Sequence, residues 1–268
     1  MSRTRGAWNT KGTWIAGLAL ASVVVLSGYA LLSGGSTTSA GSGKPVSPNP
    51  GASAPGAPGP VATYTVPKDW SEPEHWVALP RGARADEQGN PVGFPHTGEG
   101  AVAMMAEATK MTIAAGRSYA TERMRIFDAY YGKGDRTPKN AETVKAGGVE
   151  LDKGLARDMG VSQGQPLPAG AYLRVQVIGF KVIKKSDDEV SAWILTRAVQ
   201  KNSEMAPETA AIATTLVGVQ WQDGDWKQTV DATYRGLGDS KATPEPAAVA
   251  PGDQAFNSAG WTALREAS

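Results

Sequence analysis

The sequence predicts an α+β fold class: an N-terminal transmembrane helix plus one cone-like domain of about three helices packed on a curved antiparallel sheet of about four strands. Three observations predict it. A twenty-residue uncharged apolar run begins at Trp14. Apolar residues recur every three to four positions between 97 and 159, as on helices. β-Branched and aromatic residues dominate after Gly170, as in strands. Helices followed by a run of strands are typical of α+β proteins.

The apolar run at 14–33 reads WIAGLALASVVVLSGYALLS. At about 1.5 Å per residue, a helix of this length reaches about 30 Å, the thickness of a bilayer core. Arg3, Arg5 and Lys11 precede it, so the positive-inside rule predicts 1–13 as a cytoplasmic tail. We therefore expect a single-pass protein of the cell membrane with an extracytoplasmic C-terminal domain. A cleaved secretory signal with the same orientation is the alternative.

Residues 34–63 consist almost entirely of Gly, Ser, Ala, Pro and Thr, with Lys44 as the one charge. Such a segment cannot bury enough apolar surface to offset the entropy lost on ordering. We predict a disordered linker that tethers the domain to the membrane. Residues 64–96 then carry several turn signals, and we expect an extended lead-in whose Trp70 and Trp76 pack on the domain behind it.

The helical half of the domain begins at Thr97. Thr97 is a suitable N-cap and Glu99 places an acid in the first turn, where the helix dipole favours it. The apolar spacing continues to Gly116, which ends the first helix. The same spacing predicts a second helix at about 119–131 and a third at about 141–159.

The strand half of the domain 97–236 follows. Strands are predicted at 172–183, 190–199, 210–221 and 226–234, and Asp223-Gly224 is a strong hairpin signal between the last two. At least two of the tryptophans in or beside these strands should be buried; the three are Trp193, Trp221 and Trp226. Residues 237–268 are again rich in Pro and Ala and predict a C-terminal tail with a short helix near 254–267.

Composition excludes several classes of site. Lys and Arg total 27 against 26 Asp and Glu, and residues 1–63 contain four basic residues and no acid, so the rest carries a net charge of −3. This balance argues against nucleic-acid binding, which needs an excess of basic residues. Cysteine is absent, which removes disulfides and thiolate metal sites. His75 and His96 are the only histidines, so a three-histidine metal site is excluded.

Two glycine motifs match known patterns but not their structural context. Residues 160–164 match the G-x-S-x-G nucleophile elbow around Ser162, yet a helix is predicted where that motif needs a strand, and both histidines lie upstream. We predict a helix C-cap and a loop. Residues 98–103 match G-x-G-x-x-A, but no strand leads into them and Glu99 would repel a pyrophosphate. We predict a tight helix entry.

The remaining polar candidates have structural interpretations. Residues 184–189 combine two lysines with three acids and predict a solvated turn, while His96 is expected to make a backbone or capping contact. Asp231 and Tyr234, late in the sheet, would form an acid–base pair only if both face a cavity. The sequence therefore predicts no catalytic, cofactor-binding or metal-binding residue, and a protein that is not an enzyme.

Two segments resemble a known family. Gly93-Phe94-Pro95-His96-Thr97 running into Gly100-Ala101-Val102-Ala103 resembles the entry to the first long helix in actinobacterial relatives. The segment from Val217 to Lys227, VGVQWQDGDWK, resembles the closing hairpin of their outer domains. The chain thus resembles, over about residues 90–235, the membrane-anchored conjugative-transfer proteins of Gram-positive bacteria of the TcpC type. These have a nuclear transport factor 2-like outer domain like that of the type IV secretion assembly factor.

The resemblance implies a non-enzymatic structural subunit of a conjugative transfer or type IV secretion-like apparatus. Its implied partners are other membrane subunits of the apparatus and further copies of itself, with no nucleic acid, metal or cofactor. TcpC-type proteins often carry two such domains, whereas this sequence predicts one. Two other classes stay open: an anchored extracytoplasmic module that binds a small ligand, and a ketosteroid-isomerase-like enzyme.

Overall fold

The computed structural model of this chain describes residues 62–63 and 68–265. The predicted cytoplasmic tail at 1–13, the transmembrane helix at 14–33 and the linker up to residue 61 lie outside these described residues. Among the helices that are described, none is long and apolar enough to cross a membrane.

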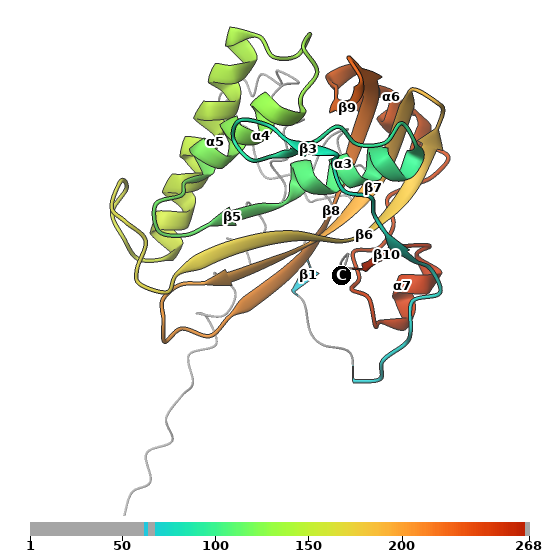
Figure 1. The fold of residues 1–268 in the computed structure, drawn as a ribbon. Coiled ribbons are helices and arrows are strands. Elements are labelled where there is room, and N and C mark those ends of the chain that lie inside the picture. The colour runs from blue at the N-terminus through green and yellow to red at the C-terminus, as the bar shows by residue number, and fades with distance from the viewer. Residues whose placement is uncertain (1–61, 64–67, 266–268) are drawn as a thin grey trace, which may run out of the picture.

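A large eight-stranded sheet forms the centre of the molecule, with the strand order β1-β8-β7-β6-β10-β2. Three long antiparallel strands dominate it (Figure 1): β6 (Tyr172–Lys185), β7 (Glu189–Lys201) and β8 (Thr209–Gln222). Two short strands lie off this path, since β5 pairs with β6 and β9 pairs with β8. The short strands of this sheet are β1 (Ala62–Thr63), β2 (Trp76–Ala78), β5 (Met111–Ile113), β9 (Asp225–Gln228) and β10 (Thr262–Arg265). A separate hairpin joins β3 (Arg84–Ala85) to β4 (Pro91–Val92).

Each described helix begins at a residue whose side chain accepts a backbone N–H of the first turn, as helix N-caps do. The helices are α3 (Gly98–Thr109), α4 (Tyr119–Tyr130), α5 (Pro138–Asp158), α6 (Val230–Asp239) and α7 (Gln254–Ser258), with caps Thr97, Ser118, Thr137, Thr229 and Asp253. The predicted N-cap at Thr97 and the second and third predicted helices are confirmed.

The predicted fold class is wrong. It has about three helices on an antiparallel sheet of about four strands, whereas the described residues hold five helices and an eight-stranded sheet. The architecture is a mixed α/β one, in which β10 and β2 pair in parallel. Strands of two to four residues are too short for a period-2 pattern to show in the sequence. Their pairing is decided by the segments that fold beside them.

Two predicted boundaries fail for identifiable reasons. Residues 111–113 continue the apolar spacing of the first helix, but they pair with β6 as a strand, because Lys110 already has extended backbone. The predicted strand 226–234 ends at Gln228, because the Thr229 side chain accepts the N–H of Ala232 and starts α6. The Asp223-Gly224 turn is confirmed, with φ of 52° and 79° at its two residues.

Alternate residues of β7 contribute to two separate cores. Ala192, Ile194 and Ala198 pack in the large core, which also contains buried residues of α3, α4 and α5. Trp193 and Leu195 point to the other face and belong to a second core. The segment after α6 covers that second face with Ala250, Phe256 and Trp261. The central sheet is therefore buried on both sides, which explains its nearly continuous run of apolar residues.

Burial of the strand tryptophans is confirmed. Trp226 is fully buried and Trp193 is 8 % exposed, while Trp221 is half-buried. In the lead-in, Trp76 packs against the second core, but Trp70 stays 59 % exposed, with its ring against Gly252.

Candidate functional site

Four segments that are separate in the sequence meet at one end of the sheet: the turn between β6 and β7, the residues before α3, the end of β8, and α6. We call the side chains that meet there the sheet-end cluster; they are His96, Asp188, Glu189, Gln220, Trp221 and Arg235. Asp188 and Trp221 lie on the α3 side of the sheet, whereas Glu189 and Gln220 lie on the α6 side, because neighbouring residues of a strand alternate between faces. The cluster therefore wraps around the sheet end.

The α3 side carries a histidine stacked on an indole. The rings of His96 and Trp221 lie 4.0 Å apart between centroids and only 10° from parallel. The edge of Trp226 contacts both rings, at 5.6 Å from His96 and 5.4 Å from Trp221. Nε2 of His96 lies 2.9 Å from Oδ1 of Asp188, and the two side chains are 42 % and 72 % exposed. The indole rings of Trp221 and Trp226 thus support an accessible His96–Asp188 pair; we call these two indoles the aromatic base.

Buried polar contacts hold that base in place. The Trp226 Nε1–H donates to the carbonyl of Pro95 at 2.9 Å. The buried carboxylate of Asp225 accepts the N–H of Phe94 and its own neighbour's N–H, both at 2.9 Å, and lies 3.2 Å from Nζ of Lys227. These contacts bind the segment just before His96 to β9. The position of the segment before His96 is therefore fixed by buried contacts and not by surface contacts.

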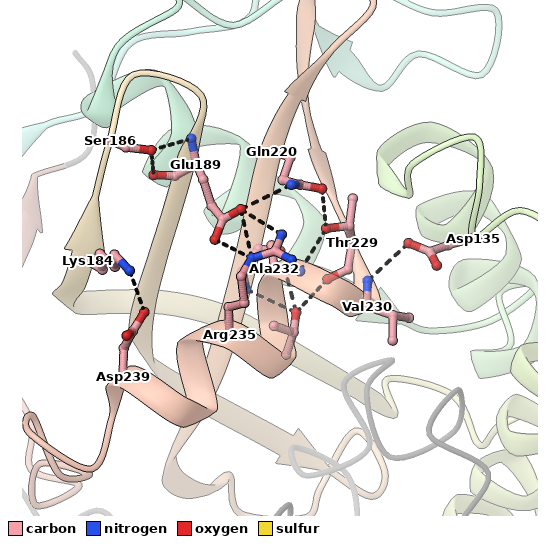
Figure 2. Close-up of polar contacts among 12 residues, drawn as sticks. Asp135, Lys184, Ser186, Glu189, Gln220, Thr229, Val230, Ala232, Arg235 and Asp239 are labelled. Carbon is pink, nitrogen blue, oxygen red and sulfur yellow. Dashed lines mark hydrogen bonds and ion pairs between the residues drawn. The ribbon is translucent and has the colours of Figure 1, made fainter.

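Figure 2 shows the polar network on the α6 side. Arg235 donates to the Glu189 carboxylate through Nε at 2.9 Å and Nη2 at 2.7 Å. Gln220 donates to the same carboxylate at 3.0 Å and accepts from the Thr229 hydroxyl at 3.1 Å. The hydrogen bonds from Arg235 lower the pKa of Glu189, and the same bonds raise the pKa of Arg235. Both groups therefore stay ionised at neutral pH, and they fasten α6 to the sheet.

Further ion pairs of alternating sign extend the cluster over the neighbouring surface. Lys184 lies 3.3 Å from Asp239 on α6, and Lys185 lies 3.9 Å from Glu99 at the start of α3. In the part of the chain that the structure describes, no three His, Asp or Glu side chains are grouped to hold a metal ion. The arrangement presents stacked aromatic rings, an anchored arginine and a charged rim, which are the components of protein–protein interfaces.

Both glycine motifs have the structural roles predicted for them. Gly100 lies so close to Pro95 that a Cβ atom would be 1.9 Å from the Pro95 carbonyl oxygen, which confirms the tight helix entry. Ser162 is exposed in the loop after α5. Gly160 has a φ of 69°, and the N–H of Val161 donates to the carbonyl of Ala156, which confirms a helix C-cap.

The polar residues that the sequence singled out have other positions or contacts than the sequence predicts. Asp231 and Tyr234 are exposed on α6, not in the sheet, so the pair does not face a cavity of the sheet. The expected capping contact of His96 is replaced by ring stacking and by Asp188, which is 92 residues away in sequence. His75 is exposed next to β2, and its carbonyl accepts the N–H of Ala263.

Sequence reasoning missed Gln220 and Arg235 altogether. Their role depends on Glu189, which lies 31 and 46 residues away from them, and no local pattern links the three. A search of family models, of curated proteins and of solved structures finds no match for this chain.

Proposed function

We propose that this protein is a non-enzymatic, membrane-anchored structural subunit of a conjugative transfer or type IV secretion-like apparatus, and that it binds neighbouring subunits through the sheet-end cluster. The observation that carries the proposal is the cluster itself. It is a partly exposed group of aromatic and charged side chains whose positions are held by the buried residues Trp226 and Asp225.

Preorganisation favours a binding role. Ordering a side chain on association costs roughly 0.5–1.5 kcal/mol, and a ring already stacked in place avoids most of that cost. Trp and Arg are also the residue types that most often dominate interface energies. His96 on Trp221, and Arg235 held by Glu189, meet both conditions. The side chains of this surface are thus already ordered before a partner binds.

The N-terminal sequence fits the same role. An apolar run at 14–33 and a linker at 34–63 would hold the domain near one membrane, where weak contacts between subunits are strengthened by a high effective concentration. The end of the linker region enters the described fold as β1, where Ala62 pairs with Ile212 of β8. The partner of such a domain is a second membrane-held subunit.

The enzyme alternative loses its main support, because Asp231 and Tyr234 lie exposed on α6. An exposed carboxylate and phenol on a helix surface lack the enclosed surroundings that acid–base catalysis uses. The small-ligand alternative is favoured by a different residue, Arg123 in the core.

The test is a comparison of two neighbouring charge reversals in the full-length protein, produced in its native cells. Asp188→Lys removes the partner of His96 and reverses the charge beside the aromatic base, while Asp187→Lys changes an exposed residue of the same turn. We expect Asp188→Lys to abolish transfer and co-purification of membrane subunits, with thermal stability and abundance unchanged. Asp187→Lys should behave like the wild type. Equal transfer by both variants would contradict the proposal, as would a His96→Ala protein that assembles normally but has lost a chemical activity.

A further inference from the structure

An arginine lies inside the core on the buried face of α4. Tyr119, Arg123 and Phe127 of α4 lie at every fourth position and form one stripe along the helix, since residues i and i+4 share a face, and the C-cap residue Tyr131 continues this spacing. All four are buried, and Arg123 is only 8 % exposed. The stripe is therefore aromatic except for one guanidinium.

Among the described residues this guanidinium has no compensating charge. Its enclosed Nε has no hydrogen-bond partner, and no described carboxylate lies within ion-pair distance. Two acids that contact α4 or belong to it are engaged in other contacts. Asp152 accepts the N–H groups of Tyr119 and Ala120, at 2.7 and 3.1 Å, and Glu122 pairs with Arg125 at 3.0 Å.

The neighbouring phenols do not supply the missing negative charge. Burial raises the pKa of Tyr131 to about 12 and that of Tyr119 further still, so both rings stay neutral at any physiological pH. The Tyr119 hydroxyl is also buried without a hydrogen-bond partner. Burying an unpaired charge and an unpaired hydroxyl one helical turn apart raises the free energy of the folded state. Both groups can donate a hydrogen bond, and both lack an acceptor oxygen.

We propose that Arg123 and Tyr119 form a binding site for the carboxylate group of a small molecule. A planar guanidinium presents parallel N–H donors that match the two oxygens of a carboxylate, and a phenol hydroxyl can donate to one of them. A carboxylate carries one negative charge, which balances the single positive charge of Arg123. Inorganic phosphate at neutral pH carries more and would leave excess negative charge in an apolar core.

This site is separate from the sheet-end cluster and is independent of the proposed assembly role. It adds a ligand to the domain whether or not the domain assembles with others. A bound carboxylate would accept hydrogen bonds from the two unpartnered donors, and the stability of the folded domain would then depend on the ligand concentration.

The experiment measures thermal unfolding of the full-length protein in sodium acetate, sodium benzoate, sodium chloride and sodium phosphate at equal ionic strength. We expect the two carboxylates to raise the Tm in a saturable manner, and chloride and phosphate to have no such effect. Arg123→Met should abolish the carboxylate effect. Arg136→Met, which removes an exposed arginine of the loop after α4 that donates to the carbonyl of Asp128, should keep it.

A second variant keeps the test decisive if Arg123→Met does not fold. Tyr119→Phe removes only the hydroxyl and should weaken acetate binding at least tenfold, measured by saturation-transfer NMR on the full-length protein. The proposal is overturned if carboxylates stabilise the wild type no more than chloride or phosphate does. It is also overturned if Tyr119→Phe and Arg123→Met both bind acetate as tightly as the wild type.

Discussion

At the residue scale, a single carboxylate connects three parts of the fold. Glu189 at the start of β7 receives Arg235 from α6 and Gln220 from β8. Because both partners favour its ionised form, the pKa of Glu189 lies below its ordinary value of 4.5. The stability that this group contributes is therefore present above about pH 4.5 and is lost as the pH falls through the lowered pKa of the folded protein.

Replacing this carboxylate should remove that pH dependence. Arg235 is half exposed, so solvent screens the pair, and Glu189→Gln should lower the free energy of unfolding at pH 7 by under about 1 kcal/mol. At pH 3 the difference from the wild type should shrink, which urea unfolding at both pH values can measure. Glu87→Gln, at an exposed carboxylate outside the cluster, is the control. A difference that stays the same at both pH values would contradict the assignment.

At the element scale, α5 shows how two glycines in one helix play opposite roles. Gly148 is the point at which α5 crosses α4, and a Cβ atom there would lie 2.5 Å from the Cα of Ala120. Gly154, six residues further along, has open space around it. The first glycine is required for the close approach of the two helices, whereas the second only loosens the helix.

Alanine at these two positions should have effects of opposite sign. Gly148→Ala should destabilise the protein by about 1–3 kcal/mol, because the backbone of α4 must move to admit the methyl group. Gly154→Ala should stabilise it by about 0.5–1 kcal/mol, because alanine loses less backbone entropy on forming a helix. The free energy of unfolding in urea measures both. A loss of stability at position 154, or none at 148, would mean that the helices cross elsewhere.

At the scale of the whole molecule, the sheet needs a cover on both faces. The segment after α6 provides the second cover and includes Trp261, which is fully buried and donates from Nε1 to the Ala247 carbonyl at 2.9 Å. A region that reads in the sequence as a Pro- and Ala-rich tail thus closes the second core. It also returns as β10, between β6 and β2.

Truncating a buried side chain of this cover should destabilise the domain. Trp261→Ala should cost about 3–5 kcal/mol, the usual range for deleting a buried Trp side chain. Trp70→Ala, which deletes an exposed ring, should cost under about 1 kcal/mol. Thermal unfolding of the two full-length variants compares them directly. Equal effects would show that the second core does not stabilise the fold.

The orientation across the membrane also belongs to the whole molecule. Because Arg3, Arg5 and Lys11 precede the apolar run, residues beyond 63 should lie outside the cell membrane. A protease added to intact, wall-stripped cells should therefore digest them. Survival of that part until the membrane is permeabilised would reverse the predicted orientation.

The sequence by itself determined the features that depend on near neighbours. Thr97 caps a helix because its own side chain reaches the N–H of Gly100, and Asp223-Gly224 turns the chain because both residues adopt positive φ. The three long strands follow from their runs of β-branched residues. Each of these signals lies within a few residues of the structure that it predicts, so each is readable without the fold.

Only the tertiary structure decided what depends on distant segments. The short strands, the second core, the stacking of His96 on Trp221 and the unpaired guanidinium of Arg123 all depend on which segments lie beside each other. Arg123 has the same local sequence signal as an exposed helical arginine. It became a candidate binding residue because the face of α4 that carries it is turned into the core, where a charge without a partner raises the free energy of the folded state.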